Sequence, residues 1–300
     1  MSRTLVIGKG GQVGFELLQS LAGAVPVMAV DVDEMDLSDP ASIRKTVREI
    51  RPNLIINAAA YTAVDQAESE PELAMAVNGI APGILAEEAR RLGAALIHYS
   101  TDYVFDGTKD APYTEDDAPC PMSAYGRTKL AGDRAIAAVD GPHLILRTSW
   151  VYGMRGKNFL LTILRLAKER DELRIVSDQI GAPTWSRAIA GATSGILSKL
   201  GYGKPGFIEA CAKQRGVYNL TAAGQTSWHG FTEAILARAA SAENRLLDRV
   251  PLLTPITTDQ YPLPAPRPRN SVLEHTKLQR EFGVTMPDWK ASLAECLRSD

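Results

Sequence analysis

The sequence predicts an α/β protein with a doubly wound parallel sheet and a smaller lobe supplied by the C-terminal half. Three observations support this class. Short aliphatic runs alternate with longer segments whose apolar residues recur at helical spacing. The short runs are almost continuously apolar, as in parallel strands that helices cover on both faces. Strand and helix in regular alternation imply right-handed crossovers, and therefore a parallel sheet.

The first half of the chain carries the regular part of this pattern. Strands are expected over Thr4–Gly8, Val25–Asp31, Leu54–Ala59, Ala95–Ser100 and His143–Ser149. The helices between them are expected over Gly11–Leu21, Pro40–Ile50, Pro71–Leu92 and Ser123–Val139. Proline at the start of the second helix is typical of a first helical turn.

The second half is less regular. Helices are expected over Phe159–Arg170, Ser186–Leu200, Ser227–Ala240 and Leu273–Phe282, and strands over Leu173–Val176 and Gly216–Leu220. Residues 251–268 hold six prolines, so we expect an extended loop that cannot join a central strand. We assign residues 1–149, with further sheet elements from about 186–220, to the sheet domain, and 150–185 and 221–300 mainly to a substrate-binding lobe.

Composition excludes several classes of protein. The chain has 300 residues, of which 45% are hydrophobic, and a formal net charge of −2. This charge gives no basic field to gather nucleic acid or anionic lipid. The three cysteines are far apart and form no CxxC pair, which argues against a disulfide framework or a zinc site. The apolar run near the N-terminus is too short for a signal peptide, and no stretch approaches the ~20 apolar residues of a membrane span. We expect a cytoplasmic protein without nucleic-acid or membrane partners.

Three glycines follow the first strand at the spacing GxxGxxG, at Gly8, Gly11 and Gly14. Glycine at these positions permits a tight turn, close approach of the backbone to a pyrophosphate, and close packing of helix on strand. A glycine-rich turn without a ligand is the alternative. The position between a strand and a helix favours dinucleotide binding in a Rossmann fold.

Asp31 ends the second strand, where a carboxylate can accept hydrogen bonds from an adenosine ribose. A surface role is the alternative, because Asp33, Glu34 and Asp36 crowd the same loop. An acid here favours NAD(H), and no arginine adjoins it to hold a 2′-phosphate, so NADH and NADPH both stay open. Small residues over 57–62 leave room for a cofactor beyond the third strand, although sheet packing alone would also select them.

Tyr125 and Lys129 are four residues apart, and therefore lie on one face of the predicted helix. Free tyrosine titrates near ~10, and a neighbouring cation lowers that pKa and makes the phenol a usable general acid or base. The Tyr-x-x-x-Lys spacing alone often occurs by chance. It becomes informative here because it follows a predicted nucleotide-binding segment at the N-terminus. Thr101 follows the fourth strand, where its hydroxyl could bind a carbonyl group or share a proton with Tyr125; a turn cap is the alternative.

Taken together, these residues resemble the extended short-chain dehydrogenase/reductase family. The resemblance spans nearly the whole chain, in the family's order, through GKGGQVG (8–14), NAAAYTAVDQAESEPE (57–72), HYSTDYVFDG (98–107), YGRTKLAGD (125–133), RTSWVYG (147–153), DQIGAPT (178–184) and RPRNS (267–271). Many reductases share GxxGxxG. STDYVFDG together with RTSWVYG and DQxGAPT is far more specific to the branch that reduces dTDP-linked keto sugars.

The resemblance implies NAD(P)H-dependent reduction of the C4 ketone of dTDP-4-dehydro-β-L-rhamnose to dTDP-β-L-rhamnose, the last step of dTDP-L-rhamnose synthesis. Tyr125 would donate the proton, Lys129 would lower its pKa and hold the nicotinamide ribose, and Thr101 would tune the transfer. The implied cofactor-binding residues are Gly8, Gly11, Gln12, Val13, Gly14, Asp31, Asp36, Leu37, Ala60, Tyr61, Thr62, Tyr99, Tyr125 and Lys129. The implied substrate-binding residues are Thr101, Asp102, Tyr125 and Trp150.

The sequence departs from the family at a metal position. Some relatives hold Mg²⁺ between subunits through glutamates, and Glu16 fits one such position. Arg187 stands where another acidic ligand belongs, and a guanidinium cannot coordinate a cation. The resemblance therefore suggests a homodimer, but this chain is not expected to hold the metal.

Two other functions stay open at this point. The regulatory subunit of methionine adenosyltransferase resembles the same family, so a non-catalytic NADP-binding module is one of them. Trp150 and the intact DQIGAPT motif favour an enzyme over that module. Another extended-family enzyme, such as a 4,6-dehydratase or an epimerase, is the second. A dehydratase usually carries acidic groups after the threonine of the TD pair, whereas Tyr103 follows Asp102 here.

Overall fold

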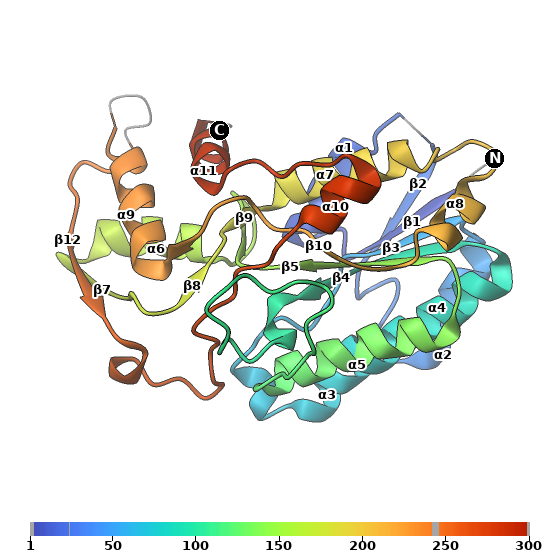
Figure 1. Cartoon of the computed structure of the whole chain (residues 1–300), viewed down its shortest axis with the longest axis horizontal. Helices are drawn as coiled ribbons and strands as arrows, with labels where there is room; N and C mark the ends of the chain where they lie inside the picture. The colour runs from blue at the N-terminus through green and yellow to red at the C-terminus, as the bar shows by residue number, and fades with distance from the viewer. Residues whose placement is uncertain (1–2, 24, 242–245, 299–300) are drawn as a thin grey trace.

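The computed structural model describes residues 3–23, 25–241 and 246–298. Its central sheet has six strands, all parallel, in the order β10-β5-β4-β3-β1-β2 (Figure 1). The strands are β1 (Thr4–Ile7), β2 (Val27–Val30), β3 (Leu54–Asn57), β4 (Ala95–Thr101), β5 (His143–Thr148) and β10 (Gly216–Asn219). The predicted doubly wound α/β class is confirmed.

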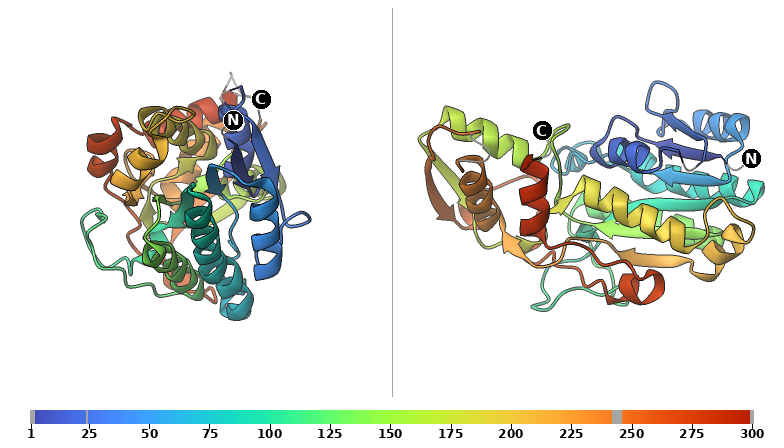
Figure 2. Two further views of the ribbon diagram at one scale, coloured as in Figure 1. Left: turned by 90° about the vertical axis from the view of Figure 1, so that its right-hand side faces the viewer. Right: turned by 90° about the horizontal axis from the view of Figure 1, so that it is seen from above.

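Helices cover both faces of this sheet (Figures 1 and 2). One layer contains α2 (Pro40–Ile50), α4 (Ala81–Leu92) and α5 (Ala124–Val139), and the other α1 (Gln12–Ser20), α7 (Ser186–Lys199), α8 (Phe207–Lys213) and α10 (Thr276–Phe282). Side chains along β1 alternate between the two cores: Leu5 and Ile7 pack with the first layer, and Val6 packs with the second. Burial on both faces explains why the strands read as continuous apolar runs.

The sheet order places a switch point at β1. Strand β2 pairs with one edge of β1 and β3 with the other, so the chain leaves β1 and β3 in opposite directions. Ile7 at the end of β1 is in register with Asn57 at the end of β3. In open α/β sheets this arrangement leaves a crevice beyond the carboxyl ends of the strands, which is where ligands bind.

The C-terminal lobe lies at the left end of the molecule in Figure 1. It comprises α6 (Phe159–Glu169), α9 (Trp228–Ala239), α11 (Trp289–Arg298), β7 (Glu172–Val176) and β12 (Leu252–Ile256). Its separate core includes Tyr152, Ile163, Phe231 and Trp289. Short strand pairs join it to the sheet: β6 (Val151–Tyr152) with β9 (Thr184–Trp185), and β8 (Ile180–Gly181) with β11 (Thr226–Ser227).

Residues 251–268 do not form the continuous loop that we expected, and that prediction is wrong in part. Leu252–Ile256 forms β12, which pairs in parallel with β7 outside the central sheet. Among the described residues, strand β12 is an edge strand that pairs only with β7. Proline, which has no N–H group to donate, is tolerated in edge strands, and Pro255 is therefore compatible with this position.

The expected continuous α-helix over Pro71–Leu92 is interrupted. It consists of α3 (Pro71–Met75), a π-helical turn η2 (Ala76–Ile80), and α4. Pro82 has no N–H to donate to the carbonyl of Asn78 in a regular helix, and Gly132 of α5 packs closely against that carbonyl. Helices α8 and α11 were not predicted. The remaining short turns are the 3₁₀ helices η1 (Gln66–Glu68), η3 (Asp102–Val104) and η4 (Thr258–Gln260).

Among the described residues, no helix is both long enough and apolar enough to cross a bilayer.

The helical layer of α2 and α4 depends on a buried carboxylate. Glu88 is 1% exposed and bonds to Arg48, Arg44 and Arg91. The hydrogen bonds from Arg48 are the main reason that its pKa falls from 4.5 to about 2. A depressed carboxyl pKa stabilises the fold above the unfolded value, and that contribution is lost as pH falls from 4.5 toward about 2.

Glu88→Gln should therefore lower the free energy of unfolding by about 2 kcal/mol near neutral pH, with a smaller loss in acid. Urea denaturation at several pH values measures both. Glu87→Gln is the matched control, because Glu87 is 53% exposed and contacts Arg44 alone among these arginines; it should change stability by less than about 0.5 kcal/mol. Equal losses in the two variants would contradict the account.

Candidate active site

The turn after β1 is formed by glycines that leave no room for side chains. Gly8 has a φ of +87°, and a Cβ there would lie 2.9 Å from the amide nitrogen of Ala59. A Cβ on Gly14 would overlap the carbonyl oxygen of Gly8. Helix α1 therefore starts close against β1, and Gly11 at its N-cap offers no side chain to the first amide groups. Free amides at a helix N-terminus fit a pyrophosphate.

A cavity of 410 Å³, here the first cavity, opens beside this turn. The predicted cofactor residues that line it are Gly8, Gly11, Gln12, Val13, Asp31, Ala60, Thr62, Tyr99, Tyr125 and Lys129. Its lining also includes Ala58 and Ala59, from the small residues expected to leave room for a cofactor, and five residues that sequence reasoning missed, namely Ser100, Thr148, Val151, Gly156 and Lys157. The structure thus brings the glycine turn and the tyrosine–lysine pair to one cavity.

Other predicted cofactor residues lie outside this lining. Gly14 packs under the turn. Asp36 accepts hydrogen bonds from the amide and hydroxyl of Ser38, at 2.8 and 2.7 Å. Leu37 is buried in the core beneath α2. Tyr61 donates its hydroxyl proton to Glu70 at 2.7 Å.

The Asp31 carboxylate closes the turn. Its Oδ2 accepts a hydrogen bond from the amide of Gly10 at 2.8 Å, while Asp31 itself lines the first cavity. The nearby cation, Lys9, is paired with Glu34. The acid at the end of β2 is therefore held in place by the main chain of the glycine turn.

Lys129 is buried on α5 with its ammonium toward β4. It is 1% exposed, and its Nζ donates to the carbonyl of Tyr99 at 2.6 Å and lies 3.1 Å from Nε2 of His98. Burial lowers the pKa of Lys129 to about 8, and the carboxylate of Asp133, one turn further along the helix, opposes that shift. Sequence reasoning missed His98 and Asp133, although the four-residue spacing from Lys129 to Asp133 was a visible signal.

Tyr125 does not have the lowered pKa that we expected. Burial raises the pKa of its phenol above the ordinary value, contact with the Thr101 hydroxyl offsets part of the rise, and Asp102 and Asp133 add to it. The expectation fails because the Lys129 ammonium is directed to the main chain of β4. The phenol is consequently protonated at neutral pH.

Thr101 and Asp102 lie directly behind Tyr125 and do not line the first cavity. Both are buried, and the Thr101 hydroxyl donates to Oδ1 of Asp102 at 3.0 Å. Burial raises the pKa of Asp102 to about 6, against the lowering effect of the Ser271 and Thr101 hydroxyls. This pair is therefore a buried polar support for the phenol.

A second cavity of 350 Å³ lies in the C-terminal lobe. Its walls include Tyr103, Phe159, Gln179, Trp228, Tyr261, Arg170, Arg174 and Arg267. The ring of Tyr103 meets that of Tyr125 edge-on, with 5.5 Å between centroids. Tyr125 in the wall of the first cavity and Tyr103 in the wall of the second are therefore in contact. Trp150, the fourth predicted substrate residue, is half-buried and stacks on Trp228.

The loop over 154–158 crosses the glycine turn and was not identified from the sequence. Asn158 donates to the side-chain oxygen of Gln12 at 3.0 Å, and the Arg155 guanidinium lies 3.8 Å from the ring centroid of Phe15. This loop brings Lys157 to the first cavity. The basic residues of this loop, Arg155 and Lys157, lie shortly after RTSWVYG and were the signal available in the sequence.

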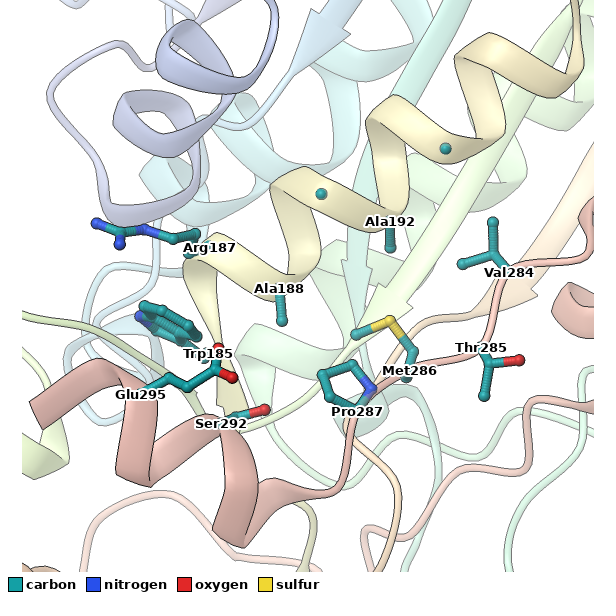
Figure 3. Close-up of a pocket in the computed structure, with 12 residues that line it drawn as sticks. Trp185, Arg187, Ala188, Ala192, Val284, Thr285, Met286, Pro287, Ser292 and Glu295 are labelled. Atoms are coloured by element: carbon teal, nitrogen blue, oxygen red, sulfur yellow. The ribbon is translucent and has the colours of Figure 1, made fainter. Parts of the chain in front are cut away.

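The surroundings of Glu16, where the resemblance would place a metal, do not fit a cation. Arg187 donates to Oε2 of Glu16 at 3.0 Å and stacks over the ring of Trp185. Figure 3 shows Arg187 and Trp185 beside each other at one end of a groove of 430 Å³, with Glu295 next to the tryptophan. Within the described part of the chain, no three His, Cys, Asp or Glu side chains gather as a metal site. Arg187 is hydrogen-bonded to the Glu16 carboxylate, which a metal would need as a ligand.

The chain is similar to known proteins over nearly its whole length. The model of the RmlD substrate binding domain matches residues 2–300. A dTDP-4-dehydrorhamnose reductase of Burkholderia thailandensis is 48% identical over 99% of this chain and 98% of its own length, and that of Escherichia coli is 43% identical over 98% and 96%. The crystal structure of dTDP-4-dehydrorhamnose reductase from Bacillus anthracis in complex with NADP superposes with a TM-score of 0.88, at 32% identity and full coverage of both chains.

A family model that spans almost the whole sequence and full-length identities above two-fifths lead to one conclusion: the chain belongs to the RmlD substrate binding domain family.

Proposed function

We infer that this protein catalyses the NAD(P)H-dependent reduction of the C4 ketone of dTDP-4-dehydro-β-L-rhamnose to dTDP-β-L-rhamnose. One observation carries the inference. A protonated phenol, Tyr125, lines the cavity that the glycine turn opens, and its ring packs against Tyr103 in the wall of the second cavity. The relatives from Burkholderia thailandensis and Escherichia coli, which match over nearly their full length, are named for the same activity.

The first cavity fits a nicotinamide dinucleotide. The amides after Gly11 and the side chain of Lys157 would hold the pyrophosphate, Asp31 an adenosine ribose hydroxyl, and Lys129 the nicotinamide ribose. Asp36, Leu37 and Tyr61 lie outside the lining of the first cavity, so their assignment to the cofactor site rests on the resemblance alone. When bound, the reduced nicotinamide supplies a hydride to the ketone carbon.

Tyr125 supplies the proton. Reduction leaves negative charge on the former ketone oxygen, and an alkoxide is more basic than a phenolate, so even a phenol with a raised pKa can protonate it. The adjoining Thr101 hydroxyl would support the phenolate that remains, since a hydrogen bond to the charged form stabilises it. The protonated state found here is the one that the reductive direction requires.

The second cavity fits the nucleotide end of the substrate. Arg170 and Arg174 are both exposed at its rim, and neither forms an ion pair within the described residues, whereas Arg267 is paired with Asp65 at 2.7 Å. Guanidinium groups suit diphosphate oxygens, and the aromatic ring of Tyr261 suits a flat base. This supports the proposal that residues 150–185 and 221–300 mainly form the substrate lobe. A homodimer and a cytoplasmic location stay predictions.

Tyr125→Phe should lower kcat by about 100-fold to 10,000-fold, because the proton donor is lost while the ring remains. NADPH oxidation followed by absorbance measures the rate, and coenzyme titration should give an unchanged Kd. The control is Tyr152→Phe, which removes a buried phenol oxygen that has no hydrogen-bond partner and lines neither cavity. Loss of coenzyme binding in Tyr125→Phe, or equal rates in both variants, would count against the assignment.

Coenzyme affinity should fall as pH rises through about 8, because Lys129 loses its proton there. A neutral amine has no charge to face the dinucleotide, so Kd for NADPH should rise by up to about tenfold per pH unit above that value. Lys129→Met should bind weakly at every pH and show no such step. A step of equal size in Lys129→Met would assign the effect to another group.

Arg174→Ala should raise KM for the sugar nucleotide roughly tenfold, because a contact to the diphosphate is lost, with kcat nearly unchanged. Arg165→Ala is the matched control, since Arg165 is 60% exposed on α6, pairs with Glu169 and does not line the cavity. Steady-state kinetics at saturating NADPH measures both parameters. An unchanged KM in Arg174→Ala would remove the nucleotide from this rim.

A further inference from the structure

Two tryptophans, Trp150 and Trp228, are stacked on each other beside the second cavity. The rings of Trp150 and Trp228 are 3.5 Å apart at their centroids and 6° from parallel. Thr148 and Val151, on either side of Trp150 in the sequence, line the first cavity, whereas Trp228 lines the second. The indole pair therefore joins a segment that borders the first cavity to the wall of the second.

The backbone around Trp150 is built for this placement. Trp150 has a φ of +47°, a conformation that L-residues rarely adopt. Gly181 lies against its indole, and a Cβ there would come within 2.5 Å of the Trp150 Cε2 atom. The main-chain oxygen of Trp150 accepts a hydrogen bond from Thr184 at 3.2 Å. The missing side chain of Gly181 and the unusual backbone conformation of Trp150 thus together set the plane of the Trp150 indole.

Trp228 is held in turn by a polar chain. Its indole Nε1 donates to Oε1 of Gln179 at 3.2 Å, and Nε2 of Gln179 lies 3.1 Å from the hydroxyl of Thr258. That hydroxyl donates to Asp178 at 2.8 Å. Gln179 is 7% exposed, so these bonds are shielded from water. The glycine and the glutamine belong to DQIGAPT, a motif to which the reaction itself assigns no role.

We propose that Trp228 and Gln179 are positioning residues for the reduction: they fix the plane of the Trp150 indole, which orients the sugar so that its ketone faces Tyr125. This inference rests on the proposed function. An indole face packs well against the C–H face of a sugar ring, and a misplacement of about 1 Å at the reacting centre can cost on the order of 100-fold in rate. Neither residue needs to touch the ketone to have this effect.

The test combines kinetics with a spectroscopic readout of Trp150. The chain has four tryptophans, so labelling with 5-fluorotryptophan gives four ¹⁹F NMR signals, which Trp→Phe variants assign. Gln179→Met removes the hydrogen bond to the indole without opening the core. It should shift the signals of Trp150 and Trp228, leave those of Trp185 and Trp289 in place, and lower kcat/KM for dTDP-4-dehydro-β-L-rhamnose roughly tenfold.

Trp228→Ala should lower kcat/KM at least as far, and Trp228→Phe, which keeps a stacking ring, less. Kd for NADPH should stay unchanged in all three variants, because none of the altered residues lines the first cavity. Trp289→Phe is the matched control in the same lobe, since Trp289 packs on Phe231 and lines neither cavity; it should keep wild-type kinetics. Gln179→Met carries the test if Trp228→Ala does not fold.

The inference is overturned if Gln179→Met moves the Trp150 signal but keeps kcat/KM within about twofold of wild type. It is also overturned if the Trp150 signal does not move. Either result leaves the proposed function intact, because the wild-type protein would still reduce the sugar. Absence of turnover by the wild-type protein would instead overturn the proposed function, and this inference with it.

Discussion

A buried ammonium group fixes the geometry on which the rest of the site depends. Lys129 is almost completely shielded from water, and a charge in that position is tolerated only with partners close by. The carbonyl of Tyr99 and the ring of His98 are those partners. His98 then contacts Asn57 at 3.1 Å, and the Asn57 oxygen accepts a hydrogen bond from the amide of Ala59 at 3.2 Å. A continuous polar chain therefore crosses from α5 over β4 to the end of β3.

This series of polar contacts links the proton donor to the nucleotide-binding turn. At one end, Tyr125 precedes Lys129 by one turn of α5, so fixing the lysine also fixes the phenol. At the other end, Ala59 lies against Gly8, whose missing side chain permits the nucleotide-binding turn. The distance between the proton donor and the turn is thus set by the core of the sheet, while the C-terminal lobe supplies a separate cavity for the rest of the substrate.

Much of the fold and part of the site could be predicted from the sequence. The strands of the sheet are recognisable in the sequence as apolar runs. Two of the three glycines, Gly8 and Gly11, line the first cavity together with the tyrosine–lysine pair. Contacts between distant segments could not be predicted. The strand within the proline-rich segment exists because β7 offers it an edge. The stack of Trp150 on Trp228 joins residues 78 positions apart, and the raised pKa of Tyr125 depends on burial that no local pattern reveals.

The central claim is that a hydride reaches C4 of the keto sugar while Tyr125 protonates the oxygen at the same carbon. Turnover of dTDP-4-dehydro-β-L-rhamnose with coenzyme deuterated at the transferable position, followed by NMR of the product, tests it most directly. We expect a rhamnose product with a single deuterium, located at C4. Deuterium at another sugar carbon, or a product without the label, would contradict the account.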